Sequence, residues 1–214
     1  TQNMYLYQYQ NEIVLLDCGI GFPDMYMPGV DTLIPDISYL QDQVEKGAKI
    51  VAMILSHGHD DHIGALPYLL GDLPEFPIYA SPLTAGFAHD RLLDKKIDRE
   101  IKVITNSQVV QVSQHFAFRL ITVTHSVPDT RHVVLQTPVG QIYHGSDFKF
   151  DQSPVDGVLS DLTTIQEVAD QGILLALIDC LRVEQTKWTK SESAIAPALE
   201  TAMSNVKGKI LVTL

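Results

Sequence analysis

Seven residues that follow a short apolar run constrain the fold more than any other part of the chain. Ile50–Leu55 is unbroken in its apolar character, as in a buried strand, and Ser56–His62 carries three histidines and two aspartates. Imidazole nitrogen and carboxylate oxygen suit zinc, with manganese or iron as competitors. Because open α/β sheets bind ligands at the carboxyl ends of their strands, we expect a metal site at such an edge.

The spacing within this loop indicates more than one metal ion. His57 and His59 are two residues apart, so in an extended loop both side chains lean to the same side. Asp61 and His62 add a second pair of ligands, which is more than one closed site needs. A histidine-rich polar turn and a structural zinc site are the alternatives, but structural sites favour cysteine and fill all four positions. We therefore predict metal binding of the catalytic type.

Further histidine and aspartate side chains follow other apolar runs. Five such residues come just after a predicted strand, and these are Asp17, His57, His125, Asp147 and Asp179. If two sheets pack together, these strand ends gather along one edge. We expect His125 to be a third nitrogen ligand and Asp147 to bridge two ions, while Asp17 is expected to orient a ligand.

Composition limits the classes of protein to consider. The chain has 214 residues, enough for one domain with a sizeable core. Its net charge of −11 argues against a broadly basic nucleic-acid surface, although bound divalent ions would add local positive charge. We see no apolar run of membrane-spanning length and no signal peptide. Cys18 and Cys180 are expected to be buried free thiols, in keeping with the cytoplasm and with no membrane partner.

Periodicity and turn residues predict a mixture of strands and helices. Strands are expected at 3–9, 13–16, 50–55, 77–80, 102–104, 109–112, 116–123, 133–137, 141–144 and 173–178, and one more begins at 209–214. The strand at 173–178 is expected to be fully buried. Helices are expected at 36–45, 63–70, 82–93, 161–171 and from a capping box at 189–192 to about 206.

Several long stretches resemble the metallo-β-lactamase superfamily, and within it the ribonuclease J branch of the β-CASP nucleases. These stretches are Met27–Asp31, Ile34–Leu40, the continuation of the metal loop Ile63–Leu70, Val123–Asp129, and Asp147–Asp151 with Pro154–Gly157. The resemblance implies the α/β (α+β) class and an αββα sandwich that is incomplete here. Residues 1–178 would be the metallo-β-lactamase domain, and 179–214 the truncated transition into the β-CASP domain.

The resemblance also implies a site with two divalent ions, zinc first and manganese second. By position, His57, His59 and His125 hold one ion, Asp61 and His62 hold the other, and Asp147 bridges them. Asp17 is similar to the first motif aspartate of the family, and Asp179 to the acidic residue that opens the β-CASP region. Asp61 and Asp147 are the expected catalytic residues, and whether Asp61 also steers a proton remains open.

The implied function is a metal-dependent phosphodiester hydrolase that cleaves RNA endonucleolytically and from 5′ to 3′ as an exonuclease. Ser126 is expected to contact phosphate, whereas Lys149 is expected to be a solvated surface cation. The full-length protein is expected to be a cytoplasmic homo-oligomer, a dimer or a tetramer. A thioesterase or lactonase, and a catalytically weak paralogue with a subunit or RNA-binding role, remain as alternatives.

The chain departs from the family pattern at several places. Cys180–Lys187 replaces the usual Ser-Thr-Asn-Ala-Glu-Arg-Pro-Gly, and Gly145-Ser146 replaces the usual Thr-Gly before the bridging aspartate. The rest of the β-CASP domain and a final histidine ligand are missing, so we expect a piece of a larger enzyme. Of the remaining histidines, we expect His89 and His115 to be exposed and His144 to lie at the edge of the core, with no metal role for these or for His132.

Overall fold

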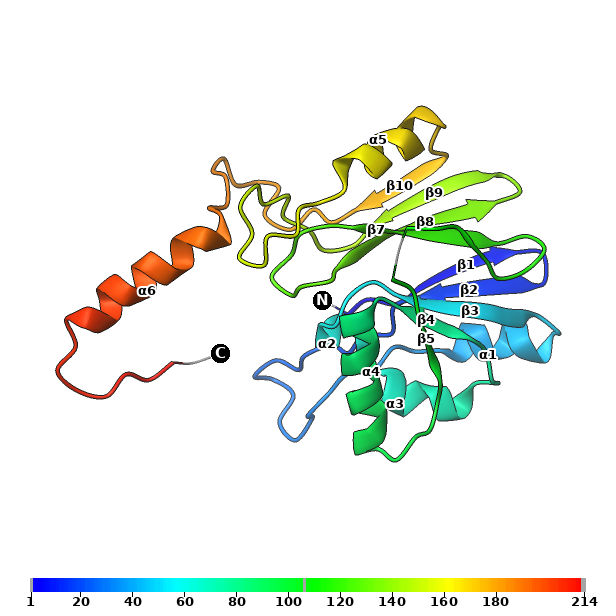
Figure 1. Cartoon of the computed structure of the whole chain (residues 1–214). Helices are drawn as coiled ribbons and strands as arrows, with labels where there is room; N and C mark the ends of the chain where they lie inside the picture. Colours follow the sequence, from blue (N-terminus) through cyan, green and yellow to red (C-terminus); the bar gives the residue numbers. More distant parts are fainter. Residues whose placement is uncertain (1, 106, 213–214) are drawn as a thin grey trace.

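The computed structural model describes residues 2–105 and 107–212, and two β-sheets pack face to face in it (Figure 1). The first sheet has the order β1-β2-β3-β4-β5, from Tyr5–Tyr9, Glu12–Leu16, Lys49–Leu55, Ile78–Ala80 and Ile101–Val103. The second has the order β10-β9-β8-β7-β6, in which β6 to β10 are Val110–Gln111, Ala117–Thr122, Arg131–Thr137, Gly140–Gly145 and Leu175–Ile178. The helices α1 to α6 are Ser38–Glu45, Asp60–Ile63, Leu66–Leu69, Pro82–Asp94, Leu162–Asp170 and Ile195–Ser204, and the 3₁₀ turns η1 and η2 are Leu70–Asp72 and Glu192–Ala194.

Strand direction brings the functionally important strand ends to one edge. β1 and β2 form the expected hairpin, and β2, β3, β4 and β5 then run parallel to one another. In the second sheet β7, β8 and β9 are antiparallel neighbours, and β10 is parallel to β9. β7, β9 and β10 therefore run in the same direction, so their carboxyl ends lie at the same edge of the second sheet.

Alternation along β2 shows how the layers are held together. Ile13 and Leu15 point into a core shared with the helices, whereas Val14 and Leu16 point into the core between the two sheets. This is the expected consequence of the two-residue period of a strand. Fully burying a side chain of this size stabilises the fold by about 1.5–3 kcal/mol relative to leaving it exposed. Both faces of the first sheet are therefore covered.

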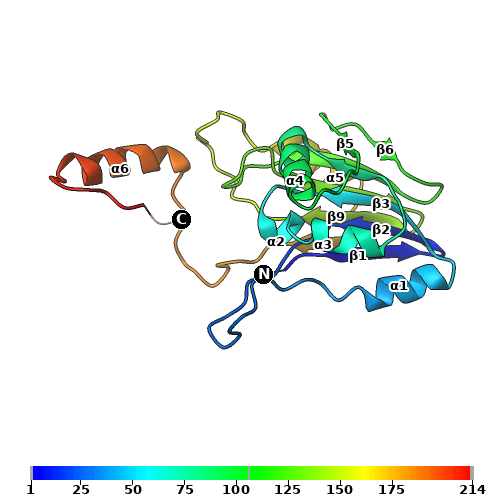
Figure 2. The same cartoon turned by 90° about the horizontal axis from the view of Figure 1, so that it is seen from below.

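Helices cover the outer faces of both sheets, which gives the αββα sandwich. α1, α3 and α4 lie over the first sheet and α5 lies over the second (Figures 1 and 2). Val168 of α5 packs against Ile121, Val134 and Tyr143. Asp161 caps this helix by accepting a hydrogen bond of 3.0 Å from the backbone of Thr164. The sandwich architecture predicted from the sequence is confirmed.

The prediction of a fully buried strand at 173–178 was wrong. Leu175 and Ile178 of β10 are 48% and 50% exposed. β10 is the end strand of its sheet, and among the described strands it pairs with β9 alone. An apolar run of this length shows that a strand can be buried, but it does not show whether a second layer covers it.

The predictions for the last part of the chain also need correction. Ser191, rather than Thr189, is the capping residue, and it caps the 3₁₀ turn η2 that leads into α6. α6 projects away from the sandwich in both views (Figures 1 and 2). Residues 209–212 form no strand, and 213–214 lie outside the described residues. The capping box was therefore placed two residues too early, and no described strand pairs with 209–212 to stabilise an extended conformation.

Further predictions concern four single side chains. Cys18 is buried as expected, but Cys180 is exposed because it follows the uncovered edge strand. His89 is exposed as expected, whereas the side chain of His115 is only 20% exposed because it pairs with Glu12 at 3.0 Å. No helix in the described parts of the chain has both the length and the apolar character needed to cross a bilayer.

Candidate metal centre

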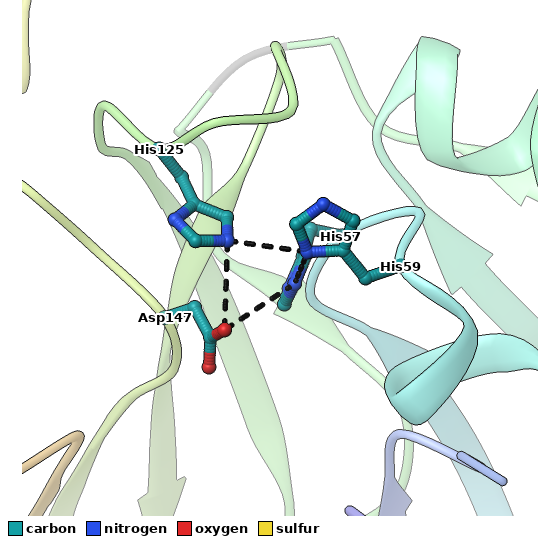
Figure 3. Close-up of side chains that lie close together, drawn as sticks. All are labelled: His57, His59, His125 and Asp147. Atoms are coloured by element: carbon teal, nitrogen blue, oxygen red, sulfur yellow. Dashed lines mark hydrogen bonds and ion pairs between the residues drawn. The ribbon is translucent and has the colours of Figure 1, made fainter. Parts of the chain in front are cut away.

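The strand ends from the two sheets meet at one edge of the sandwich. Asp17 directly follows β2 of the first sheet, and His57 comes two residues after β3. His125 comes three residues after β7, and Asp147 comes two residues after β9 of the second sheet. In Figure 3 the side chains of His57, His59, His125 and Asp147 point toward one another across the gap between the sheets. The two sheets thus contribute ligands to the same site.

The donor atoms of these four residues all lie within 4.8 Å of one another. His59 Nδ1 is 3.1 Å from His57 Nε2 and 3.2 Å from His125 Nε2 (Figure 3). Asp147 Oδ2 is 3.5 Å from His125 Nε2 and 4.0 Å from His57 Nε2. Four ligand atoms of a tetrahedral zinc, each about 2.0–2.2 Å from the ion, lie about 3.3 Å from one another. Three nitrogens and one carboxylate oxygen at these separations therefore fit such an ion.

Asp61 and His62 form a second pair of donors next to this group. They lie in α2, which begins directly after the loop that carries His57 and His59. His62 Nε2 is 3.8 Å from Asp61 Oδ2 and 3.4 Å from Asp147 Oδ1. The two oxygens of Asp147 therefore face different histidines: Oδ2 faces His57 and His125, and Oδ1 faces His62. This is the arrangement that a bridging carboxylate requires.

A buried hydrogen-bond network behind the histidines sets which ring nitrogen is free. Asp17 accepts hydrogen bonds from the backbone of Ser56 at 2.7 Å and from its hydroxyl at 2.8 Å, and His62 Nδ1 is 2.7 Å from the same carboxylate. The Ser56 hydroxyl donates to Asp17, so it can only accept from His57 Nδ1 at 3.0 Å. The Nε2 atoms of His57 and His62 consequently face the site, as metal ligands must.

The last member of this network is Ser146, which connects the two sheets. Its hydroxyl donates to that of Ser56 at 3.0 Å and lies 3.4 Å from His57 Nδ1. Sequence reasoning noted Ser146 only as a departure from the usual family residue and missed Ser56 as a support for the ligands. The signal available was the position of each serine beside a ligand at the end of an apolar strand.

Burial and neighbouring charges shift the pKa values of the site. Burial, together with the neighbouring His62, lowers the pKa of His57 to about 3, so this imidazole is neutral. Burial would lower the pKa of His62 as well, but the carboxylates of Asp17 and Asp147 outweigh it and raise the pKa to about 10. The hydrogen bond between Asp147 and His62 lowers the pKa of Asp147 to about 2. Without an ion, His62 therefore carries a proton that a metal has to displace.

Three other predicted site residues lie around this centre. Asp179 is half-buried after β10, and its carboxylate accepts a hydrogen bond of 2.8 Å from the backbone of Leu181, which shapes the following turn. Ser126 is exposed beside His125. Lys149 is not a freely solvated cation, because its side chain is only 18% exposed and lies 3.5 Å from Asp151 and 3.8 Å from Glu192. Asp151 is close to Lys149 in sequence, but nothing in the sequence near Lys149 indicated the contact with Glu192.

Comparison with known proteins identifies the class to which this site belongs. The model of the metallo-beta-lactamase superfamily matches residues 1–184. The chain therefore belongs to the metallo-beta-lactamase superfamily. This membership, together with the cluster of His57, His59, His125 and Asp147, supports binding of a divalent metal. This match extends a few residues beyond our expected domain boundary after residue 178, and that boundary stays a prediction.

Among its relatives, the chain is similar to proteins named ribonuclease J. It is 38% identical over 219 residues to that of Thermus thermophilus, an alignment that covers 99% of this chain and 38% of the relative. It is 33% identical over 214 residues to that of a Synechocystis species, covering 99% of this chain and 33% of the relative. The chain thus spans roughly a third of the length of these relatives.

Solved structures with low sequence identity share the fold. The short form of human tRNase Z is 16% identical with a TM-score of 0.52, and the alignment covers 94% of this chain and 81% of that one. A protein of unknown function from Enterococcus faecalis is 15% identical with a TM-score of 0.61, covering 94% of this chain and 54% of that one. At this level of identity these likenesses bear on the fold alone.

Proposed function

We propose that this chain carries the metal centre of a phosphodiester hydrolase that cleaves RNA and uses two divalent ions. The observation that carries the proposal is the position of Asp147, whose two oxygens face two separate groups of ligands. The similarity to proteins named ribonuclease J over 99% of the chain supports RNA as the substrate.

The ligands divide into two sets that share one carboxylate. His57, His59 and His125 would hold the first ion, Asp61 and His62 the second, and Asp147 both. Zinc fits the three nitrogens and one oxygen of the first set best, and manganese is the alternative because carboxylates suit it. Ions held in this way lower the pKa of water and stabilise negative charge on a phosphate and on the leaving oxygen.

The chain itself supplies orientation and proton handling. Asp17 and Ser56 hold the rings of His57 and His62 with Nε2 facing the substrate side. The Asp61 carboxylate is half-buried and its Oδ2 lies 3.8 Å from His62 Nε2, so it faces the second set of ligands, where we assign it a role in proton transfer as well as in metal binding. We assign catalytic roles to Asp61 and Asp147 and a phosphate contact to the exposed Ser126. Asp179 is proposed to orient the ligands from the end of β10.

The family resemblance extends the proposal to the whole protein. Cleavage would be both endonucleolytic and 5′-to-3′ exonucleolytic. The protein would be a homo-oligomer, a dimer or a tetramer, in the cytoplasm.

A comparison of substrates tests the proposal. The purified full-length protein, stripped of metal and reloaded with zinc or with manganese, is assayed on labelled RNA and on a thioester. We expect cleavage of RNA that requires the metal and no turnover of the thioester. Hydrolysis of the thioester alone would favour a thioesterase or lactonase. Metal binding without any turnover would favour a catalytically weak paralogue.

A further inference from the structure

Asn3 is not among the predicted ligands, yet its side chain reaches the Asp61–His62 pair. Its Nδ2 is 3.0 Å from His62 Nε2 and 3.4 Å from Asp61 Oδ2. Its Oδ1 accepts a hydrogen bond of 3.0 Å from the hydroxyl of Tyr5. Asn3 is half-buried and stands just before β1, far in sequence from the metal loop. The sequence offered no spacing that connects it with the site.

The orientation of this amide follows from its neighbours. An ionised carboxylate oxygen can only accept a hydrogen bond, so the NH₂ end of the amide must face Asp61. The hydroxyl of Tyr5 can then donate to the oxygen at the other end of the amide. Both ends of the Asn3 side chain are therefore held, and its donor group faces the second pair of ligands.

The backbone of Asn3 is fixed to the same part of the molecule. Its N–H donates to the carbonyl of Asp61 at 2.9 Å, and its carbonyl accepts from the N–H of Gly19 at 2.8 Å. α2, which carries Asp61 and His62, has only four residues, and so short a helix has little stability of its own. The position of the Asp61 side chain therefore depends on contacts with neighbouring segments.

We propose that Asn3 is a positioning residue for the second half of the metal centre. Its amide keeps the Asp61 carboxylate facing His62 and Asp147, so that the ligands of the second ion are in place before it binds. This inference rests on the proposed two-ion function. Within the described chain, the polar atoms of the Asn3 side chain contact those of Asp61, His62 and Tyr5. Its influence should therefore be confined to the second ion.

Calorimetric titration of the metal-stripped protein with Zn²⁺ tests this proposal. The variants are Asn3→Ala, Tyr5→Phe and, as a matched control, Asn11→Ala in the exposed β1–β2 turn. For Asn3→Ala we expect the second ion to bind about 10–100-fold more weakly, the usual cost of losing a partner that orients a ligand. The affinity for the first ion should not change. Tyr5→Phe keeps the ring but frees one end of the amide, so it should weaken the second ion by a smaller factor.

The possible outcomes separate this inference from the proposed function. If Asn3→Ala weakened the binding of both ions equally, its role would be merely structural and the inference would be overturned. The inference would also be overturned if Asn3→Ala lost folded structure by circular dichroism while Tyr5→Phe left the affinity for the second ion unchanged. Two ions bound equally well by wild type and Asn3→Ala would overturn the inference alone. A wild-type protein that binds no ion would contradict the proposed function itself. A wild-type protein that binds a single ion would show that there is no second site for Asn3 to position, and would overturn the inference.

Discussion

Asp147 and His57 should differ in how many of the two ions each helps to hold, and the metal content of variants measures this difference. Asp147 is shared by both ligand sets, because its Oδ1 faces His62 and its Oδ2 faces His125. Asp147→Ala should therefore reduce the content of both ions, whereas His57→Ala should reduce mainly the first. We expect each change to lower RNA cleavage by at least about 100-fold.

Metal analysis by plasma mass spectrometry, alongside the cleavage assay, measures these effects. His89→Ala on the exposed face of α4 is the matched control and should leave both quantities unchanged. Full activity in Asp147→Ala or in His57→Ala would reject the ligand assignment.

Asp61 allows the roles of ligand and proton acceptor to be separated. Asp61→Asn keeps the shape of the side chain and one coordinating oxygen but removes its charge and basicity. We expect the rate of RNA cleavage to fall by more than the content of the second ion. Parallel measurement of turnover and of bound metal decides the matter, since a strictly proportional fall would mean that Asp61 is a ligand only.

The buried pair of Asp17 and His62 makes the stability of the metal-free chain depend on pH. His62 has a pKa of about 10 in the folded chain, above its ordinary value of 6.5. Its contribution to stability is therefore complete below pH 6.5 and is lost as the pH rises towards 10. The pKa of Asp17 is lowered: burial opposes this shift, and the neighbouring His62 causes it. The contribution of Asp17 is thus lost in acid.

Urea unfolding of the metal-stripped protein at pH 6, 8 and 10 measures this dependence. The midpoint should fall from the first pH to the last, and the fall should be smaller in Asp17→Asn, where His62 has lost its partner. An equal fall in both proteins would contradict the assignment of this pH dependence to the pair.

At the scale of the elements, close backbone contact fixes α2 against the segment that follows β2. A Cβ added at Gly19 would lie 1.6 Å from the carbonyl oxygen of Asp61, which is backbone and cannot move aside cheaply. We expect Gly19→Ala to lower the free energy of unfolding by about 1–3 kcal/mol or more. Gly86→Ala is the matched control, because it adds a methyl group to open space in α4 and should stabilise the helix by about 1 kcal/mol. Urea unfolding of both variants measures the difference, and equal stabilities would contradict this explanation.

Much of the fold could be predicted from the sequence because local patterns determined it. The alternation of Val14 and Leu16 with their neighbours, the cap at Asp161 and the apolar run before Ser56 are all properties of a few adjacent residues. The exposed edge at β10, the lack of a strand at 209–212 and the contact of Lys149 with Glu192 depend on what lies beside each of them in space. The same distinction explains why histidines with ligand spacing were recognised, whereas Asn3, which reaches the site from a segment far away in sequence, was not.

At the scale of the whole molecule, the candidate ligands of the first ion come from both sheets. His57 and His59 follow β3 of the first sheet, and His125 and Asp147 follow strands of the second. An ion that binds the folded state alone stabilises it by about 2.7 kcal/mol at a free concentration 100 times its Kd. Removal of metal with a chelator should therefore lower the melting temperature, as measured by scanning calorimetry.

The control for this effect is His57→Ala. Its melting temperature should respond less to the chelator than that of the wild type. An identical response would show that the chelator acts somewhere other than at this site.

The division of the ligands between two sheets also has a kinetic consequence. An ion held by both sheets leaves either by stepping off one ligand at a time or when the two layers separate at that edge. Because the His57 ring is buried and held from behind by Ser56, the first route is restricted. The rate of metal exchange should then equal the rate at which the two sheets separate transiently at this edge, so that the residence time of the ion measures this opening.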